Sequence, residues 1–194
     1  MKYNPEKHHR RSIRLQGYDY ASAGMYFVTI CTFQRQCLFG DIVADETRLN
    51  ELGQIVVHEW LRSQDIRQEI DFDAWVIMPN HIHGIVVIHP PNTPQSSDTQ
   101  RHPVGANGRS PLHGIAFQPM KPRSLSSFIA GFKSATTKQI NLIRNAPGTP
   151  VWQRNYYDHV IRNEMSLEHL RAYIHNNPLS WQEDQLHPDV DSNW

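Results

Sequence analysis

The run from Asp71 to Ile88 (DFDAWVIMPNHIHGIVVI) most constrains the fold of this 194-residue chain. It holds two apolar stretches of strand length, Phe72–Met78 and Ile82–Ile88. Their β-branched and aromatic residues favour β-strands, and the Pro79-Asn80 dipeptide between them favours a turn. The run therefore predicts two strands in a tight hairpin, or one edge strand with a bend.

Two histidines stand in the second stretch. His81 and His83 share one face of the predicted strand with Ile85 and Val87, because side chains alternate along a strand. An imidazole pair in apolar surroundings must be hydrogen-bonded or metal-bound to offset its desolvation. The alternatives are satisfied core histidines or a partial ligand set of another metallo-fold. Two histidines with an amide oxygen would suit Mg or Mn, whereas Zn prefers a third nitrogen or sulfur.

A later segment, Leu167–Pro178 (LEHLRAYIHNNP), has helical spacing and a polar stripe. Tyr173 and Asn177 are four residues apart in it, so a helix presents them together. Asn163 or Ser166 could cap this helix. A tyrosine attacks phosphorus when its phenol lies in line with a metal-polarised phosphodiester. The alternative for Tyr173 is a half-buried tyrosine with a bonded hydroxyl.

The remaining periodicity predicts the other elements of the chain. We expect strands over Met25–Phe33 and within Val151–Arg162, and helices over Thr47–Gln68 and Ser124–Ile143. The resulting order is β, α, β, β, α, β, α. This order predicts an α+β fold, a ferredoxin-like antiparallel sheet with helices packed on one face.

Composition suggests how the chain is divided. We expect a basic arm over residues 1–24, one catalytic domain over 25–180 and a tail over 181–194. A Pro- and Ser-rich stretch at about 89–122 predicts a flexible insertion in that domain. No apolar run approaches the roughly 20 residues needed to cross a bilayer, and the first residues lack a signal-peptide core. We therefore expect a cytoplasmic protein with no membrane partner.

Charge is balanced over the chain but unevenly placed. Lys and Arg total 19, as do Asp and Glu, yet no acidic residue occurs between Thr99 and Tyr157. Such a distribution can present a basic face to a phosphate backbone, because salt screening makes local charge decisive. Lys133, Lys138 and Arg154 are the candidates for DNA contact in this region. The alternative is that these cations are scattered over solvated faces.

Several segments together resemble the REP-associated tyrosine transposases, within the HUH single-tyrosine insertion-sequence superfamily. The matching segments are RRSIRLQGYDY with YFVTICTF, AWVIMPNHIHGIVV, SLSSFIAGFKSATTK, VWQRNYYDHVIRNE and LRAYIHNNP. The resemblance implies an HUH endonuclease core, a divalent metal held by His81 and His83, and Tyr173 as nucleophile. It places Asn177 where relatives carry a third, amide-type ligand, often glutamine.

The resemblance also implies a reaction and a substrate. Tyr173 would cleave single-stranded DNA beside a palindromic hairpin, leaving a 5′-phosphotyrosine and a free 3′-hydroxyl, for transposition or mobilisation of a repeat element. Arg10, Arg11 and Arg14 resemble an arm that relatives use to read a guide sequence; the alternative is a basic tail without that role. REP-associated relatives tend to be monomers, so a monomer is favoured, although a homodimer is possible.

Two other functions remain open from the sequence. One is a domesticated DNA-hairpin-binding protein that does not cut, although His81, His83 and Tyr173 are intact. The other is a metal-dependent phosphohydrolase such as a histidine-triad protein, in which a further histidine would be expected where Ile85 stands.

Overall fold

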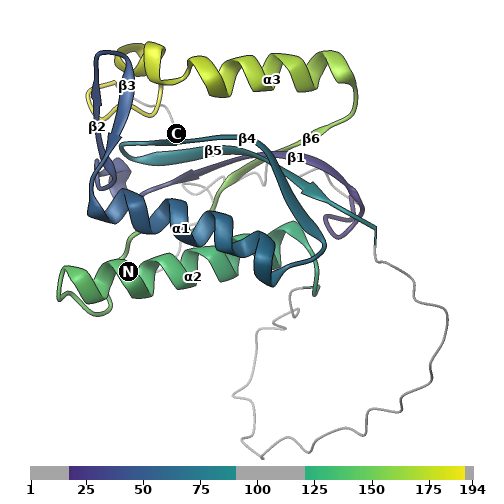
Figure 1. Cartoon of the computed structure of the whole chain (residues 1–194), viewed down its shortest axis with the longest axis horizontal. Coiled ribbons are helices and arrows are strands. Elements are labelled where there is room, and N and C mark those ends of the chain that lie inside the picture. Colours follow the sequence, from purple (N-terminus) through teal and green to yellow (C-terminus); the bar gives the residue numbers. More distant parts are fainter. Residues whose placement is uncertain (1–17, 91–120, 191–194) are drawn as a thin grey trace, which may run out of the picture.

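A four-stranded antiparallel sheet forms the centre of the structure, a computed structural model that describes residues 18–90 and 121–190 (Figure 1). The strand order is β4-β5-β1-β6. The strands are β1 (Gly24–Cys31), β4 (Ile70–Met78), β5 (His81–Ile88) and β6 (Tyr157–Ile161). β1 and β5 occupy the middle of the sheet, where neighbours pair with both of their edges.

Helices cover both faces of this sheet. α1 (Glu51–Ile66) and α2 (Leu125–Ile143) lie side by side on one face, and α3 (Glu164–Asn176) lies on the other (Figure 1). The α+β class with an antiparallel ferredoxin-like sheet is confirmed. The prediction that the helices pack on one face holds for α1 and α2 and not for α3.

The reason for the second helical layer is that β1 and β5 are apolar on both faces. Val28 and Ile82 pack with Trp60 of α1 in the larger core, whereas Phe27 and Ile85 form a second core on the opposite face. Leu167, Leu170 and Ile174 of α3 complete this second core. A sheet buried on both sides needs a cover on both sides. The histidines of β5 therefore lie beneath α3.

A small hairpin precedes α1, where the sequence predicted an earlier helix start. β2 (Gly40–Val43) pairs with β3 (Glu46–Leu49), and α1 begins at Glu51 rather than near Thr47. Asn50 caps the helix, and its side chain accepts a hydrogen bond from the Gly53 amide at 3.0 Å. A Cβ at Gly53 would lie 2.2 Å from the Phe39 carbonyl, so glycine lets this helix approach the hairpin closely.

A tight turn at Pro79 and Asn80 joins β4 to β5, which settles the choice between a hairpin and a bent strand. Backbone groups from a neighbouring connection hold this turn. The Thr32 amide donates to the Asn80 carbonyl at 2.8 Å, and the Phe39 amide donates to the Pro79 carbonyl at 3.0 Å. Asn80 is fully buried. The first residue of β5, His81, therefore starts from a fixed backbone.

The chain after α3 returns over the start of β5. A short 3-10 helix, η2 (Pro178–Glu183), follows α3, and we name residues 184–190 the C-terminal strap. Trp181 of η2 is buried, and Trp194 lies outside the described residues. Four side-chain hydrogen bonds hold the strap. Arg35 donates to the carbonyls of Gln185, His187 and Val190, and Asn80 donates to the carbonyl of Leu186.

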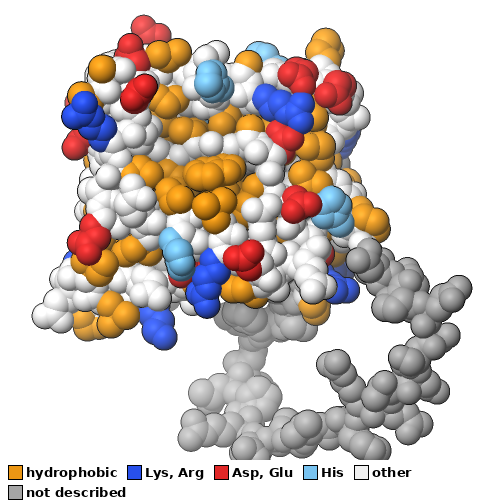
Figure 2. All heavy atoms as spheres, viewed as in Figure 1, with side chains coloured by type: hydrophobic (Ala, Val, Ile, Leu, Met, Phe, Trp, Pro, Cys, Tyr) orange, Lys and Arg blue, Asp and Glu red, His pale blue; other side chains and the backbone are white. Residues whose placement is uncertain are grey.

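The surface seen in Figure 2 carries hydrophobic side chains at its centre and charges of both signs around them. The centre lies between α3 and the pair formed by α1 and α2. This face is therefore not a uniformly basic one. In the described ranges, no helix has the length and apolar character needed to cross a membrane.

Candidate functional site

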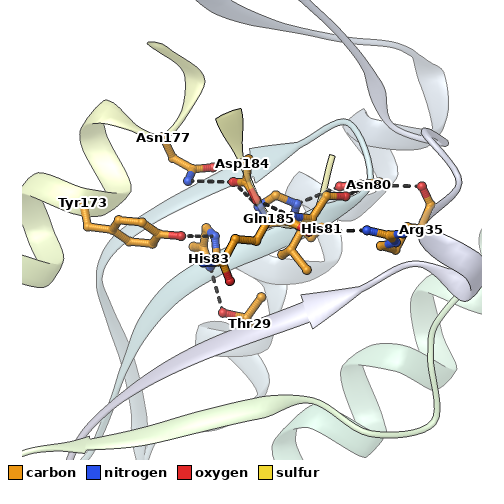
Figure 3. A network of polar contacts seen from close by, with 10 residues as sticks. Thr29, Arg35, Asn80, His81, His83, Tyr173, Asn177, Asp184 and Gln185 are labelled. Carbon is orange, nitrogen blue, oxygen red and sulfur yellow. Dashed lines mark hydrogen bonds and ion pairs between the residues drawn. The ribbon is translucent and has the colours of Figure 1, made fainter. Parts of the chain in front are cut away.

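The two histidines of β5 point toward α3 from the buried middle of the sheet (Figure 3). His81 is fully buried and His83 is 2% exposed. Their ring centroids are 4.5 Å apart, as expected for alternate residues of one strand. Burial lowers the pKa of His81 to about 4, against the opposing effect of Asp184, and burial with the neighbouring His81 lowers the pKa of His83. Both pKa shifts favour the neutral imidazole, which is the form that binds metals.

The Asn80 side chain fixes the tautomer of His81. Its Nδ2 donates to the backbone carbonyls of Arg35 and Leu186 at 3.1 and 2.7 Å, which identifies the NH₂ end of the amide. Its Oδ1 lies 2.7 Å from His81 Nδ1 and can only accept a hydrogen bond. His81 therefore carries its proton on Nδ1 and presents the lone pair of Nε2 to the interior of the site.

His83 lies between a threonine and the predicted nucleophile. Thr29 is its partner in the β1–β5 register, and the Thr29 hydroxyl lies 2.8 Å from His83 Nδ1. The Tyr173 hydroxyl lies 3.2 Å from His83 Nε2. The fold thus brings together three residues that the sequence separates by 54 and 90 positions.

Tyr173 occupies the side of α3 that faces the histidines, and 43% of it remains exposed. Burial of its hydroxyl end, together with the negative charge of Asp184, raises its pKa to about 12. The helix is oriented at its start by Asn163, whose side chain accepts from the Ser166 amide at 2.8 Å. Of the two predicted caps, Asn163 is the one used. The phenol therefore lies at the boundary between the buried histidines and solvent.

Asp184 completes a buried group that sequence reasoning missed. Three side chains, those of His81, His83 and Asp184, each offer one ligand atom, and these three atoms lie within 4.8 Å of one another. The carboxylate Oδ2 is 3.9 Å from His81 Nε2. Asp184 lies in the polar tail just after η2, with no periodic pattern around it, so no sequence signal pointed to it.

Asn177, the predicted amide-type ligand, lies beside this group as the last residue before η2. Its Nδ2 donates to Asp184 Oδ2 at 3.1 Å. Its Oδ1 is buried and has no hydrogen-bond partner within the described ranges. The Asn177 amide therefore contacts Asp184 through its nitrogen, and the role of Asn177 as a metal ligand stays a prediction.

The side chains of this buried group have the chemistry that a metal ion requires. His81 Nε2 and Asn177 Oδ1 are both buried, and neither has a hydrogen-bond partner among residues 18–90 and 121–190. Buried acceptors left unpaired in this way cost free energy, so a missing partner is expected there. Imidazole nitrogens and carboxylate oxygens are ordinary ligands of divalent cations. His81, His83 and Asp184 could therefore hold a metal ion.

The predicted DNA-contacting residues lie apart from this group or outside the described residues. Lys138 and Arg154 are exposed. The Lys133 ammonium donates to the carbonyls of Gln153 and Asn155, both at 2.9 Å, so this cation supports the chain after α2. Arg10, Arg11 and Arg14, like most of the predicted insertion, lie outside the described residues.

A separate cavity of about 610 Å³ is lined by several tyrosines and by two of the predicted DNA-contacting cations. It lies at the start of α2, against the segment before β1. Its lining includes Tyr18, Tyr20, Tyr156, Lys133 and Arg154. Aromatic rings beside cations are the residue types that bind unpaired bases.

Comparisons with known proteins place the chain among relatives. No family model matches it. An uncharacterized protein of Haemophilus influenzae is 40% identical over 191 residues, which cover 97% of this chain and 98% of the relative. A solved REP-associated tyrosine transposase, bound to a REP hairpin, aligns with a TM-score of 0.56 and 20% identity over 87% of this chain and 74% of its own. A solved structure from Deinococcus radiodurans aligns with a TM-score of 0.39 and 17% identity over 85% of this chain and 97% of its own.

Proposed function

The chain belongs to one family with the uncharacterized Haemophilus influenzae protein and has the fold of a REP-associated tyrosine transposase, and from this we propose that it cuts and rejoins single-stranded DNA. The proposed substrate is a hairpin formed by a palindromic repeat. The proposed nucleophile is Tyr173, and the proposed outcome is strand transfer for DNA transposition or mobilisation of a repeat element.

One observation carries this proposal most directly. The Tyr173 hydroxyl lies 3.2 Å from His83 Nε2, at the open side of the buried His81–His83–Asp184 group. A structural tyrosine needs only a bonded hydroxyl, and any backbone carbonyl could provide the partner. A half-exposed phenol beside a set of metal-type donors is instead the arrangement that nucleophilic attack on a phosphodiester requires.

The step we propose conserves the phosphodiester energy. The Tyr173 oxygen forms a bond to phosphorus, the bond from phosphorus to the 3′-oxygen breaks, and the phenolic proton is balanced by the proton that the leaving oxygen takes up. The products are a 5′-phosphotyrosine and a free 3′-hydroxyl. Reversal with another 3′-hydroxyl rejoins strands, so no nucleotide cofactor is needed.

His81, His83 and Asp184 would hold the divalent cation, with Asn177 as a further candidate through Oδ1. Such a cation, Mg²⁺ or Mn²⁺, supplies charge to polarise the phosphate and favour the phenolate. The protein's own part is to orient the phenol, since burial raises the pKa of Tyr173 and so disfavours its ionisation.

We propose a monomer as the active form. Tyr173 and His83 meet within one chain, so the site needs no helix from a second copy. Lys138, Arg154 and the tyrosine-lined cavity are the described surfaces that we propose to contact DNA, together with Arg10, Arg11 and Arg14 of the arm.

The test is covalent capture of DNA. Purified protein with Mn²⁺ is incubated with a labelled single-stranded hairpin taken from the DNA that flanks its own gene, and a denaturing protein gel reveals any adduct. Wild type should carry the label and Tyr173→Phe should not, while hairpin binding stays within a few fold. Tyr157→Phe, which changes a tyrosine of β6, is the matched control and should keep the adduct.

Other outcomes assign the other functions. Hairpin binding without an adduct in wild type would indicate a DNA-binding protein that does not cut. Cleavage without an adduct would indicate a phosphohydrolase. An adduct that persists in Tyr173→Phe would move the nucleophile to another tyrosine.

A further inference from the structure

We propose that Asp184 is a ligand of the metal ion, and that Arg35 and Asn80 are positioning residues that deliver it by holding the C-terminal strap. The inference rests on the metal site of the proposed function and adds to it the means by which Asp184 is brought to the site. It makes cation binding depend on a segment that lies beyond the last helix of the core.

The Asp184 carboxylate is buried beside neutral hydrogen-bond donors. Oδ1 accepts from the Leu186 amide at 2.6 Å, and Oδ2 accepts from Asn177 Nδ2 at 3.1 Å. The side chain is 5% exposed, and no Lys or Arg of the described residues lies within ion-pair distance of it. Burial of a carboxylate without a cation is costly, even when neutral groups donate to it. The facing Nε2 of His81, which lacks a partner among the described residues, marks where a cation would meet both groups.

Asp184 lies outside the helices and strands of the described residues. It directly follows η2, and the residues after it run as the strap. Arg35 is what secures that run, since its Nη1 lies 3.2 to 3.3 Å from three strap carbonyls. Arg35 and its neighbour Gln34 have positive φ values of 56° and 53°, a conformation that non-glycine residues rarely adopt. The local backbone is therefore held in an uncommon shape that directs the guanidinium to the strap.

The side-chain amide of Asn80 contacts both the strap and a histidine. Asn80 Nδ2 donates to the carbonyls of Leu186 and Arg35, and Asn80 Oδ1 fixes His81 as the Nδ1–H tautomer. The lone pair of His81 Nε2 and the carboxylate of Asp184 are thus aligned through the same side chain (Figure 3). By linkage, whatever favours the docked strap strengthens cation binding, and the bound cation favours the docked strap.

The experiment measures Mn²⁺ binding to the full chain, without DNA, by calorimetric titration and by the electron paramagnetic resonance of free Mn²⁺. Asp184→Asn should weaken binding by more than about tenfold, as loss of a ligand does. Asn keeps an acceptor for the Leu186 amide, and Asn177 can turn its amide so that Oδ1 accepts from the new Nδ2, so the fold should survive. Asp189→Asn removes the same charge from the exposed part of the strap, and its binding should match wild type.

Arg35 is tested in the same titration. Arg35→Met should weaken Mn²⁺ binding by about tenfold although Arg35 touches no proposed ligand atom, and Arg35→Lys should restore part of the affinity. Arg48→Met, an exposed arginine of β3, is the control. A second readout is chymotrypsin cleavage near Leu186, which Mn²⁺ should slow in wild type and not in Asp184→Asn. Circular dichroism and unfolding without metal confirm that each variant folds.

The outcomes distinguish a failure of this inference from a failure of the proposed function. Absence of Mn²⁺ binding in wild type would overturn the proposed metal site itself. Binding in wild type that is equal in Asp184→Asn would overturn only the ligand assigned here and leave Asn177 as the candidate. Weak binding in Asp184→Asn with unchanged binding in Arg35→Met would keep the ligand and overturn the positioning role.

Discussion

Single side chains that touch neither DNA nor metal decide the geometry of the histidines, and Thr29 is the clearest example. Its hydroxyl is the partner of His83 Nδ1, and Thr29 itself is 7% exposed. Thr29→Val keeps the shape and leaves that nitrogen unpaired. We expect Mn²⁺ affinity to fall by about 10- to 100-fold, the usual effect of removing a group that orients a ligand. Calorimetric titration measures it.

Thr47 provides the control for this substitution. Its hydroxyl in β3 is also buried, but it has no hydrogen-bond partner among the described residues. Thr47→Val should therefore leave Mn²⁺ affinity unchanged and should not lower stability, because no hydrogen bond is lost. Equal Mn²⁺ affinity in Thr29→Val and Thr47→Val would show that the threonine of β1 does not orient His83.

At the scale of elements, the placement of Tyr173 depends on how α3 is attached to the sheet. Arg171 of α3 makes two hydrogen bonds to the carboxylate of Asp73 in β4, from Nε at 2.8 Å and from Nη2 at 2.5 Å. The Arg171 hydrogen bond lowers the pKa of Asp73. A two-point contact of this kind fixes direction as well as distance. We infer that it sets the angle at which the helix presents its tyrosine.

This contact predicts a pH dependence of stability. Because the pKa of Asp73 is lowered by folding, its contribution is present above the unfolded pKa of about 3.9 and is lost as the pH falls through the lower folded value. Asp73→Asn should therefore unfold at a lower temperature than wild type at pH 7, and the difference should shrink below about pH 4. Thermal unfolding followed by circular dichroism measures it.

Two comparisons complete the test. Asp65→Asn, at an exposed position of α1, should follow the wild-type pH profile. Arg171→Met should resemble Asp73→Asn in stability and should also slow adduct formation, since Tyr173 is two residues further along the same helix. A constant stability difference between Asp73→Asn and wild type from pH 7 to pH 3 would contradict the assignment.

The sequence predicted the elements that have strong periodicity. The two strands of Asp71–Ile88 and the helices follow from β-branched and aromatic composition and from helical spacing, and the cap of α3 follows from the Asn at its start. It did not predict the β2–β3 hairpin, because these strands have four residues each and half-exposed side chains. Their turn uses Ala44 and Asp45 at positive φ, in place of the Asn-Gly pair that usually marks such a turn.

The site was predictable in part for the same physical reason. His81, His83 and Tyr173 stand on regular elements, where spacing determines which side chains share a face. Asp184 stands on an irregular segment whose path is set by contacts with Arg35 and Asn80, about 100 to 150 residues earlier. No local pattern encodes contacts of that range. The side of the sheet that α3 covers was equally hidden, because both faces of β5 are apolar.

For the whole molecule, the question is whether one chain contains the complete catalytic apparatus. Tyr173 meets His83 of the same chain, and the Arg171–Asp73 contact joins the tyrosine helix to its own sheet. If two copies exchanged this helix, His83 of one copy would work with Tyr173 of the other. We expect no exchange, so that the monomer is active alone.

Mixing two inactive variants distinguishes these arrangements. His83→Ala lacks a predicted ligand and Tyr173→Phe lacks the nucleophile, so each alone should form no adduct with the hairpin. In a dimer that exchanges helices, one of the two sites of a mixed dimer would combine an intact His83 with an intact Tyr173, and the adduct would return. In a monomer every site contains one defect. We therefore expect no adduct from the mixture after the two proteins are unfolded and refolded together, while wild type treated in the same way recovers activity. Recovery in the mixture would establish helix exchange, and the 3.2 Å contact within one chain would then describe a resting form.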